Sequence, residues 1–155
     1  MAAEADVQFF TVEWWRGDDE SDPFPSYRAH IAALRSKLVP DLLAIDERVS
    51  LHDAWLRDLV LNPTAGTLQL VLDGDDHGEL CKITLRYAKV TLFHCIADPE
   101  KGLPGPHGYG DLGYDEIDLA GNEFVHRILF SSGVEFEIRF GGFTLKVEPA
   151  IQRGC

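Results

Sequence analysis

The clearest alternation of hydrophobic and polar positions lies near the end of the chain. Residues 123–131 and 134–140 carry apolar side chains at every second position, and Ser132-Gly133 lies between them. Two alternating runs around so short a connection predict an antiparallel hairpin with one face on the core. Residues 143–147 predict a further strand, which Pro149 closes.

Earlier parts of the chain follow the same period of two. Cys81, Ile83, Leu85 and Tyr87 form an apolar set within residues 79–87 and are expected to face the core. Further strands are predicted at 55–61, 67–72, 90–96 and 114–119. The first of these also fits one face of a helix, and the turn signal at 62–66 favours the strand.

The first third of the chain has a different pattern. β-branched and aromatic residues at 7–15 favour a strand, and the polar residues at 16–23 favour a solvated loop. Tyr27, Ile31, Leu34 and Leu38 then follow a helical stripe. Ser26 is expected to cap this helix at its start and Pro40 to end it, before a second short helix at 42–49.

These elements predict an α+β fold in a single domain, residues 1–155. A helical N-terminal third, 24–50, would pack on one face of a β-rich region, 55–148. The sheet is expected to be twisted and mainly antiparallel, with about six to eight strands and one or two N-terminal helices on one face.

Composition then limits the function classes. The 155 residues are 45% hydrophobic and 26% charged, which suits one globular domain with its own core. The formal net charge is −12, without a cluster of Lys and Arg. Binding to nucleic acid or to an anionic membrane needs such clusters, so neither is expected, whereas a basic protein partner suits the charge. Solubility alone also explains the acidity.

Cysteine usage and hydropathy indicate the compartment. Cys81, Cys95 and Cys155 are an odd number without CxxC spacing, which favours reduced thiols over disulfides. No apolar run approaches the roughly 20 residues that cross a bilayer. The acidic N-terminus lacks the basic region of a signal peptide. A cytoplasmic protein is therefore expected.

The segment Leu51-His52-Asp53-Ala54-Trp55 marks the change from helical to strand patterns. A carboxylate beside an imidazole can fix its tautomer, but neighbours in a strand point to opposite faces, so this pair cooperates only in a turn. The favoured interpretation is a hinge in which Asp53 caps backbone amides, with Leu51 and Trp55 as its anchors. A metal-assisted or other hydrolase centred on His52, Asp53 and the loop at 98–113 is the alternative.

Two other segments contain candidate binding residues. Trp14 and Trp15 precede an acidic run, Asp18, Asp19, Glu20 and Asp22, and aromatic anchors beside acidic rims are typical of protein interfaces. The favoured alternative is that both tryptophans fix the N-terminal segment to the core. Residues 98–113 form one long irregular segment rich in Gly and Pro, in which Tyr109 and Asp111 are candidates.

Patterns typical of enzymes and metal sites are weak. GxSxG, GxxxxGK[ST] and HExxH are absent, and the GxGxxG at 108–113 lies in a loop among strands. Histidines 94, 107 and 126 with Asp111, Asp115 and Glu116 lack metal-site spacing, and His126 shares a face with core residues. Residues 73–78 depart from the calcium-loop pattern and indicate a polar turn. No cofactor is expected, and an enzyme is the less favoured class.

The order of these features resembles a family. Trp14-Trp15, a helix led by Tyr27, the tetrapeptide at 51–54 and the closing hairpin at 127–140 resemble small uncharacterised bacterial proteins, some similar to immunity proteins of polymorphic toxin systems. The resemblance implies an acidic cytosolic α+β protein that binds another protein, with no catalytic residues to carry over. An inhibitor of a basic partner is the resulting expectation, and a homodimer or homo-oligomeric scaffold is a further alternative.

Overall fold

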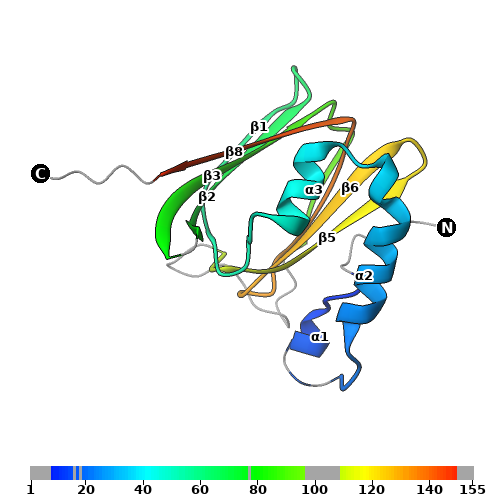
Figure 1. The fold of residues 1–155 in the computed structure, drawn as a ribbon. Helices are drawn as coiled ribbons and strands as arrows, with labels where there is room; N and C mark the ends of the chain where they lie inside the picture. The colour runs from blue at the N-terminus through cyan, green and yellow to red at the C-terminus, as the bar shows by residue number, and fades with distance from the viewer. Residues whose placement is uncertain (1–7, 16, 18, 77, 97–108, 150–155) are drawn as a thin grey trace, which may run out of the picture.

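The computed structural model describes residues 8–15, 17, 19–76, 78–96 and 109–149. The helices are α1 (Val12–Trp15), α2 (Pro23–Leu34) and α3 (Pro40–Glu47), with the 3-10 turn η1 (Arg35–Lys37) after α2 (Figure 1). The strands are β1 (Trp55–Asn62), β2 (Thr67–Asp76), β3 (Glu79–Ala88), β4 (Leu92–Ile96), β5 (Leu112–Ala120), β6 (Glu123–Phe130), β7 (Glu135–Phe140) and β8 (Gly142–Pro149).

The α+β class, the antiparallel pairing and the N-terminal position of the helices are confirmed. The single twisted sheet that we expected is instead divided in two. Within the described residues, β1-β2-β3-β8 form one four-stranded sheet and β4-β7-β6-β5 form the other. The strands predicted at 55–61 and 79–87 and the hairpin at 123–140 correspond to β1, β3 and β6–β7.

The two sheets are joined where the chain bends between β3 and β4 and, beside it, between β7 and β8. β3 leads through Lys89 into β4, and β7 leads through Gly141 into β8, while β3 pairs with β8 and β4 with β7. Lys89 takes a positive φ of 52°, and the N–H of Gly141 donates to the carbonyls of Ala88 and Lys89. The sharp bend explains why one continuous pairing pattern yields two sheets.

Both sheets and the helices contribute to one hydrophobic core. The set predicted to face inward from β3, Cys81, Ile83, Leu85 and Tyr87, is buried as expected. The helical stripe is buried at Tyr27, Ile31 and Leu38 and partly buried at Leu34. Because β5 and β8 are edge strands, their outer backbone groups need other partners.

Helix side chains supply those partners. The N–H of Ile117 in β5 donates to the Tyr27 hydroxyl at 2.7 Å, and the His30 ring donates to the Ile117 carbonyl at 3.0 Å. On the other edge, the N–H of Leu145 in β8 donates to Asp41 at 2.9 Å. α2 therefore lies against β5, and α3 against β8, as Figure 1 shows.

The strand predicted at 7–15 is wrong in the described part of that range. Residues 8–10 form bends, and α1 follows at Val12–Trp15. The backbone amides of Gln8, Phe9 and Phe10 donate to the side chain of Glu116 rather than to a neighbouring strand. A single carboxylate thus takes the place of the strand partner that the hydrophobic pattern implied.

Both predicted boundaries of the first helix are corrected. α2 begins at Pro23, and the Asp22 carboxylate caps it by accepting from the N–H of Phe24 at 3.0 Å. Pro40 starts α3 rather than ending α2, because proline suits the first helical position, where no N–H is required. Within the described chain no helix is both long and apolar enough to cross a membrane.

Candidate functional site

A cavity of about 580 Å³ opens between α2, the segment from α3 to β1, and the start of β5. Such a volume is within the range of ligand pockets, roughly 300–1,000 Å³. Five ring-bearing side chains line it: Phe10, Phe24, Tyr27, His52 and Tyr114. Five charged residues also line it: Arg28, Asp46, Glu47, Arg48 and Asp115.

Tyr114 is the centre of the aromatic wall. Its ring centroid lies 5.2 Å from that of Phe10, 5.1 Å from His52 and 5.0 Å from Trp14. The ring of Trp15 lies 5.4 Å from that of Tyr114, edge to face. Gly113 makes this approach possible, because a Cβ atom there would overlap the Trp15 ring. Offset and edge-to-face contacts of this kind hold the rings in fixed positions.

The segment from Leu51 to Ala54 forms the predicted turn at one side of the cavity. Leu51 and Ala54 are buried, whereas Trp55 is 44% exposed, so Ala54 rather than Trp55 is the second anchor of the hinge. Asp53 has a positive φ of 66°, and its N–H donates to the carbonyl of Leu112 at 2.8 Å. The turn is therefore attached to the start of β5.

This turn brings His52 and Asp53 together, as a strand could not. His52 Nδ1 lies 2.5 Å from the carbonyl oxygen of Gly113, and because a carbonyl only accepts, Nδ1 is the donor. Nε2 lies 3.5 Å from Asp53 Oδ1, with the two side chains 47% and 76% exposed. The expected cap by Asp53 is thus replaced by a carboxylate beside the imidazole at the cavity wall.

The cavity is acidic because the three lining carboxylates, Asp46, Glu47 and Asp115, outnumber its two arginines. Partial burial raises the pKa of Asp46, and the charges of Asp115 and Glu47 raise it further against the opposing effect of Arg35. Burial also raises the pKa of Tyr27, whose hydroxyl lies in the field of Asp115 and Asp46. Burial is the larger cause of both pKa shifts, and the negative charge of Asp115 adds to each.

A buried chain of hydrogen bonds holds Asp115 from behind. His126, fully buried in β6, lies 2.7 Å from Asp115 Oδ2 through Nε2 and 2.6 Å from the Tyr87 hydroxyl through Nδ1. Burial, with the charge of Asp115, raises the pKa of Tyr87 well above its usual value, so Tyr87 keeps its proton and donates it. His126 Nε2 then donates to Asp115, whose side chain remains 21% exposed.

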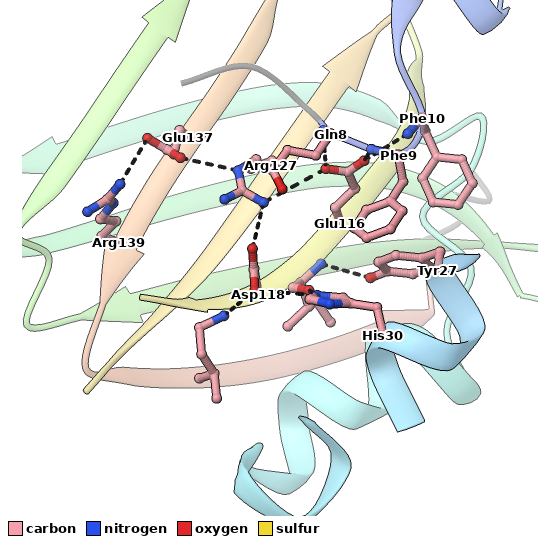
Figure 2. Close-up of polar contacts among 12 residues, drawn as sticks. Gln8, Phe9, Phe10, Tyr27, His30, Glu116, Asp118, Arg127, Glu137 and Arg139 are labelled. Atoms are coloured by element: carbon pink, nitrogen blue, oxygen red, sulfur yellow. Dashed lines mark hydrogen bonds and ion pairs between the residues drawn. The ribbon is translucent and has the colours of Figure 1, made fainter. Parts of the chain in front are cut away.

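A second polar network lies on the opposite face of the same sheet (Figure 2). Arg127, 6% exposed, contacts Asp118 at 3.1 Å and Glu137 at 3.2 Å. It also lies 3.9 Å from Glu116, the carboxylate that binds the amides of residues 8–10. Burial raises the pKa of Glu116, while those amides and Arg127 oppose the rise. Among the described residues this network does not line the cavity.

The acidic run predicted as a binding segment leads into α2, whose first turn contributes one residue to the cavity. Asp18 lies outside the described residues, and Asp19, Glu20 and Asp22 are exposed. Phe24, two residues after Asp22, lines the cavity. Trp14 and Trp15 are partly buried and pack against the aromatic wall, which is the role that we favoured from the sequence.

The candidates Tyr109 and Asp111 lie apart from the lining. The Tyr109 ring packs on Phe130 and Phe136, with centroids 5.7 and 5.6 Å away. Asp111 is exposed and forms a backbone bridge with Trp55. Residues 97–108 of the predicted irregular segment lie outside the described chain.

The metal interpretation finds no further ligands. Among the residues that the structure describes, no group of three His, Cys, Asp or Glu is placed to hold an ion. His126 is occupied by Asp115 and Tyr87, and His107 lies outside the described residues. In the segment that resembled a calcium loop, Asp75 Oδ1 accepts from the N–H of Gly78 at 2.6 Å, as in a polar turn.

Sequence reasoning missed the residues that carry most of the cavity. Tyr27 was only part of an apolar stripe, and Tyr114 and Asp46 were not singled out. Asp115 entered only as a possible metal ligand. Strand alternation would place the neighbours Tyr114 and Asp115 on opposite faces, so it gives no signal that both line one cavity, and β5 departs from regular pairing between Leu112 and Tyr114.

Comparisons with known proteins add little. No protein-family model matches the chain, and no curated protein matches it. Among solved structures it is similar to an uncharacterized protein from Neisseria gonorrhoeae, with 14% sequence identity and a TM-score of 0.43. The match covers 63% of this chain and 93% of that one. A similarity at this level says nothing about function.

Proposed function

We propose that the chain is a cytoplasmic protein-binding module, an immunity-like inhibitor of a basic partner. The observation that carries this proposal is the acidic, aromatic-walled cavity beside the exposed acidic run that leads into α2. Aromatic side chains in a partly buried pocket supply the anchoring contacts of protein interfaces. The net charge of −12 favours partners of opposite sign.

Inhibition would be steric and electrostatic. Asp19 and Glu20 are exposed, and hydrogen bonds from Ser21 lower the pKa of Asp19, which keeps its carboxylate charged. Exposed charges of this kind accelerate encounter with an oppositely charged protein and lose their effect as salt rises. The cavity would then hold part of the partner, and the bound chain would cover the partner's active surface.

A hydrolase centred on His52 and Asp53 is the second candidate, because His52 lines the cavity and the Asp53 carboxylate lies 3.5 Å from its ring. The two candidates differ in what His52→Ala does. In the inhibitor, His52 forms part of the wall that contacts the partner, so the variant weakens the complex without abolishing it. In a hydrolase, any turnover of ester or phosphate substrates by the purified protein would disappear with this substitution.

The test of the proposed function starts with the proteins encoded beside this chain. Each is expressed alone and together with it. We expect one basic product to arrest growth, and the chain to restore growth and to co-purify with that product. Rescue without a complex, or no complex with any neighbouring product, contradicts the proposal.

A matched pair of variants then tests the acidic run. Asp19→Asn/Glu20→Gln removes two exposed charges from the run that precedes α2, and Asp58→Asn/Glu79→Gln removes two exposed charges on β1 and β3. We expect only the first pair to slow association, and the difference to vanish at high salt. Equal effects of the two pairs would show that the acidic run has no special role.

A further inference from the structure

The carboxylate of Asp115 is fixed before any ligand arrives. Its Oδ2 atom is held by His126, which is held in turn by Tyr87. Burying a polar chain across the core is costly unless every member is paired, and this chain pairs the two buried members. Its outer end is a carboxylate at the cavity, so the arrangement holds one negative group in a set position for binding.

The interior of the cavity is negative although arginines also line it. Arg28, Arg48 and Asp46 are all exposed, but neither arginine is among the charges that shift the pKa of Asp46 or Tyr27. Asp115 raises both of those pKa values. A ligand with a carboxylate or phosphate would therefore meet like charge from Asp46 and Asp115, whereas a cation would relieve their repulsion.

The walls suit a flat cation better than a compact one. Tyr114 and His52 have ring centroids 5.1 Å apart at one side, and Phe24 is 40% exposed. A guanidinium group stacks on aromatic faces and donates five N–H groups in a plane, which fits two separate carboxylates. An ammonium is a compact, strongly hydrated charge and loses more on entering such a pocket.

We propose that this cavity binds an arginine side chain of the basic protein partner, with the guanidinium between the aromatic wall and the carboxylates of Asp46 and Asp115. This inference rests on the proposed function, because the arginine belongs to the protein that the chain inhibits. His126 acts here as a positioning residue that orients Asp115. The volume of about 580 Å³ leaves room for the arginine and for chain beside it.

Free amino-acid derivatives test the cavity without the partner. The ¹⁵N-labelled chain is titrated with N-acetyl-arginine methylamide, its neutral isostere N-acetyl-citrulline methylamide, and N-acetyl-lysine methylamide. We expect the arginine derivative to shift the amide resonances of residues 113–115 and 52, with a dissociation constant of about 1–10 mM for one side chain. Citrulline should bind at least about fivefold more weakly, and lysine should lie between the two.

Matched variants assign the effect to the two carboxylates. Asp46→Asn and Asp115→Asn keep the shape of the side chain, and asparagine at 115 can still accept from His126. Each should weaken binding of the arginine derivative about three- to tenfold. Asp53→Asn removes a carboxylate that is 76% exposed and outside the lining, so it should change binding less than about twofold.

The outcomes separate this inference from the proposed function. Citrulline binding as well as arginine, shifts away from the cavity, or equal losses in all three variants would overturn the arginine site. Tighter binding of the lysine derivative would overturn the choice of guanidinium. A complex with a neighbouring gene product but no arginine binding leaves the inhibitor standing without this site. Arginine binding without any protein complex refutes the inhibitor alone.

Discussion

The two faces of the sheet β4-β7-β6-β5 carry two different polar networks. On the outer face, Arg127 lies among Glu116, Asp118 and Glu137, and the amides of residues 8–10 complete the coordination of Glu116. On the inner face, His126 connects the buried Tyr87 to Asp115. The first network is closed within the described residues that form it, while the second ends at a carboxylate in a cavity.

We therefore assign the outer network to stability and the inner network to ligand binding. A network whose carboxylates are all bound by Arg127 or by backbone amides fixes the N-terminal segment on the sheet and offers little to a ligand. The inner network ends in Asp115, whose charge repels that of Asp46 and raises its pKa. This repulsion lowers the stability of the fold but leaves negative charge in the cavity for a ligand. Substitutions in the two networks should therefore differ in size and, at the cavity, in sign.

The largest loss is expected at the centre of the closed network. Arg127→Met keeps much of the side-chain volume but leaves buried carboxylates without their cation, which should lower the free energy of unfolding by about 3–5 kcal/mol. Urea unfolding measures it. Arg57→Met is the control, because Arg57 is 58% exposed beside Asp73 and its pair should contribute at most about 1 kcal/mol. Equal losses would contradict a sealed network.

A smaller loss is expected from the inner chain of hydrogen bonds. His126→Leu leaves the buried Tyr87 hydroxyl without its acceptor, and should cost about 1–3 kcal/mol. Tyr87→Phe should cost about 1 kcal/mol for the same bond. Because the two share one interaction, the double variant should lose less than the sum in urea unfolding. Strict additivity would show that the bond between them contributes nothing.

A substitution in the turn at 51–54 should have the next largest effect on stability. Asp53 has a φ of 66°, a conformation that Asp, Asn and Gly accept more readily than Ala. Asp53→Ala should therefore lower the free energy of unfolding by about 1 kcal/mol, whereas Asp53→Asn should leave it nearly unchanged. Thermal unfolding of both variants checks this. An equally stable Asp53→Ala protein would contradict the hinge.

The smallest effect is expected from Asp46→Asn, which should raise the free energy of unfolding rather than lower it. The folded-state pKa of Asp46 lies above its ordinary value of 3.8. The stability linked to this group is therefore present below about pH 3.8 and is lost as the pH rises through the folded pKa. At pH 7 Asp46→Asn should be slightly more stable than the wild type, and the advantage should shrink towards pH 4. Asp58→Asn, on the exposed part of β1, is the control in the same urea series.

The strands could be predicted because their pattern is local. The alternation in residues 79–87 and 123–140 specifies both the strand and its inward face, and β3, β6 and β7 follow it. The hinge at 51–54 could be located because a turn signal on its far side defined β1. Local preference and burial agree in these segments, so sequence alone is sufficient.

The remainder depends on contacts between distant residues. Gln8, Phe9 and Phe10 have a strand-like composition, but their amides bind Glu116, more than one hundred positions later. Glu135 and Glu137 alternate with apolar residues as an exposed face would, yet each is only 1% exposed. No periodicity records that a segment covers the outer face of a sheet, or that Tyr114, Asp46 and Asp115 meet at one cavity.

The central claim is that the carboxylates of Asp46 and Asp115 together bind a cation in the cavity. The pKa of Asp46, followed through its side-chain carboxyl ¹³C resonance with and without N-acetyl-arginine methylamide, tests it most directly. We predict a pKa above 3.8 in the free protein that falls when the arginine derivative binds, because a cation favours the charged carboxylate. A pKa that stays the same at saturating arginine derivative would contradict the claim.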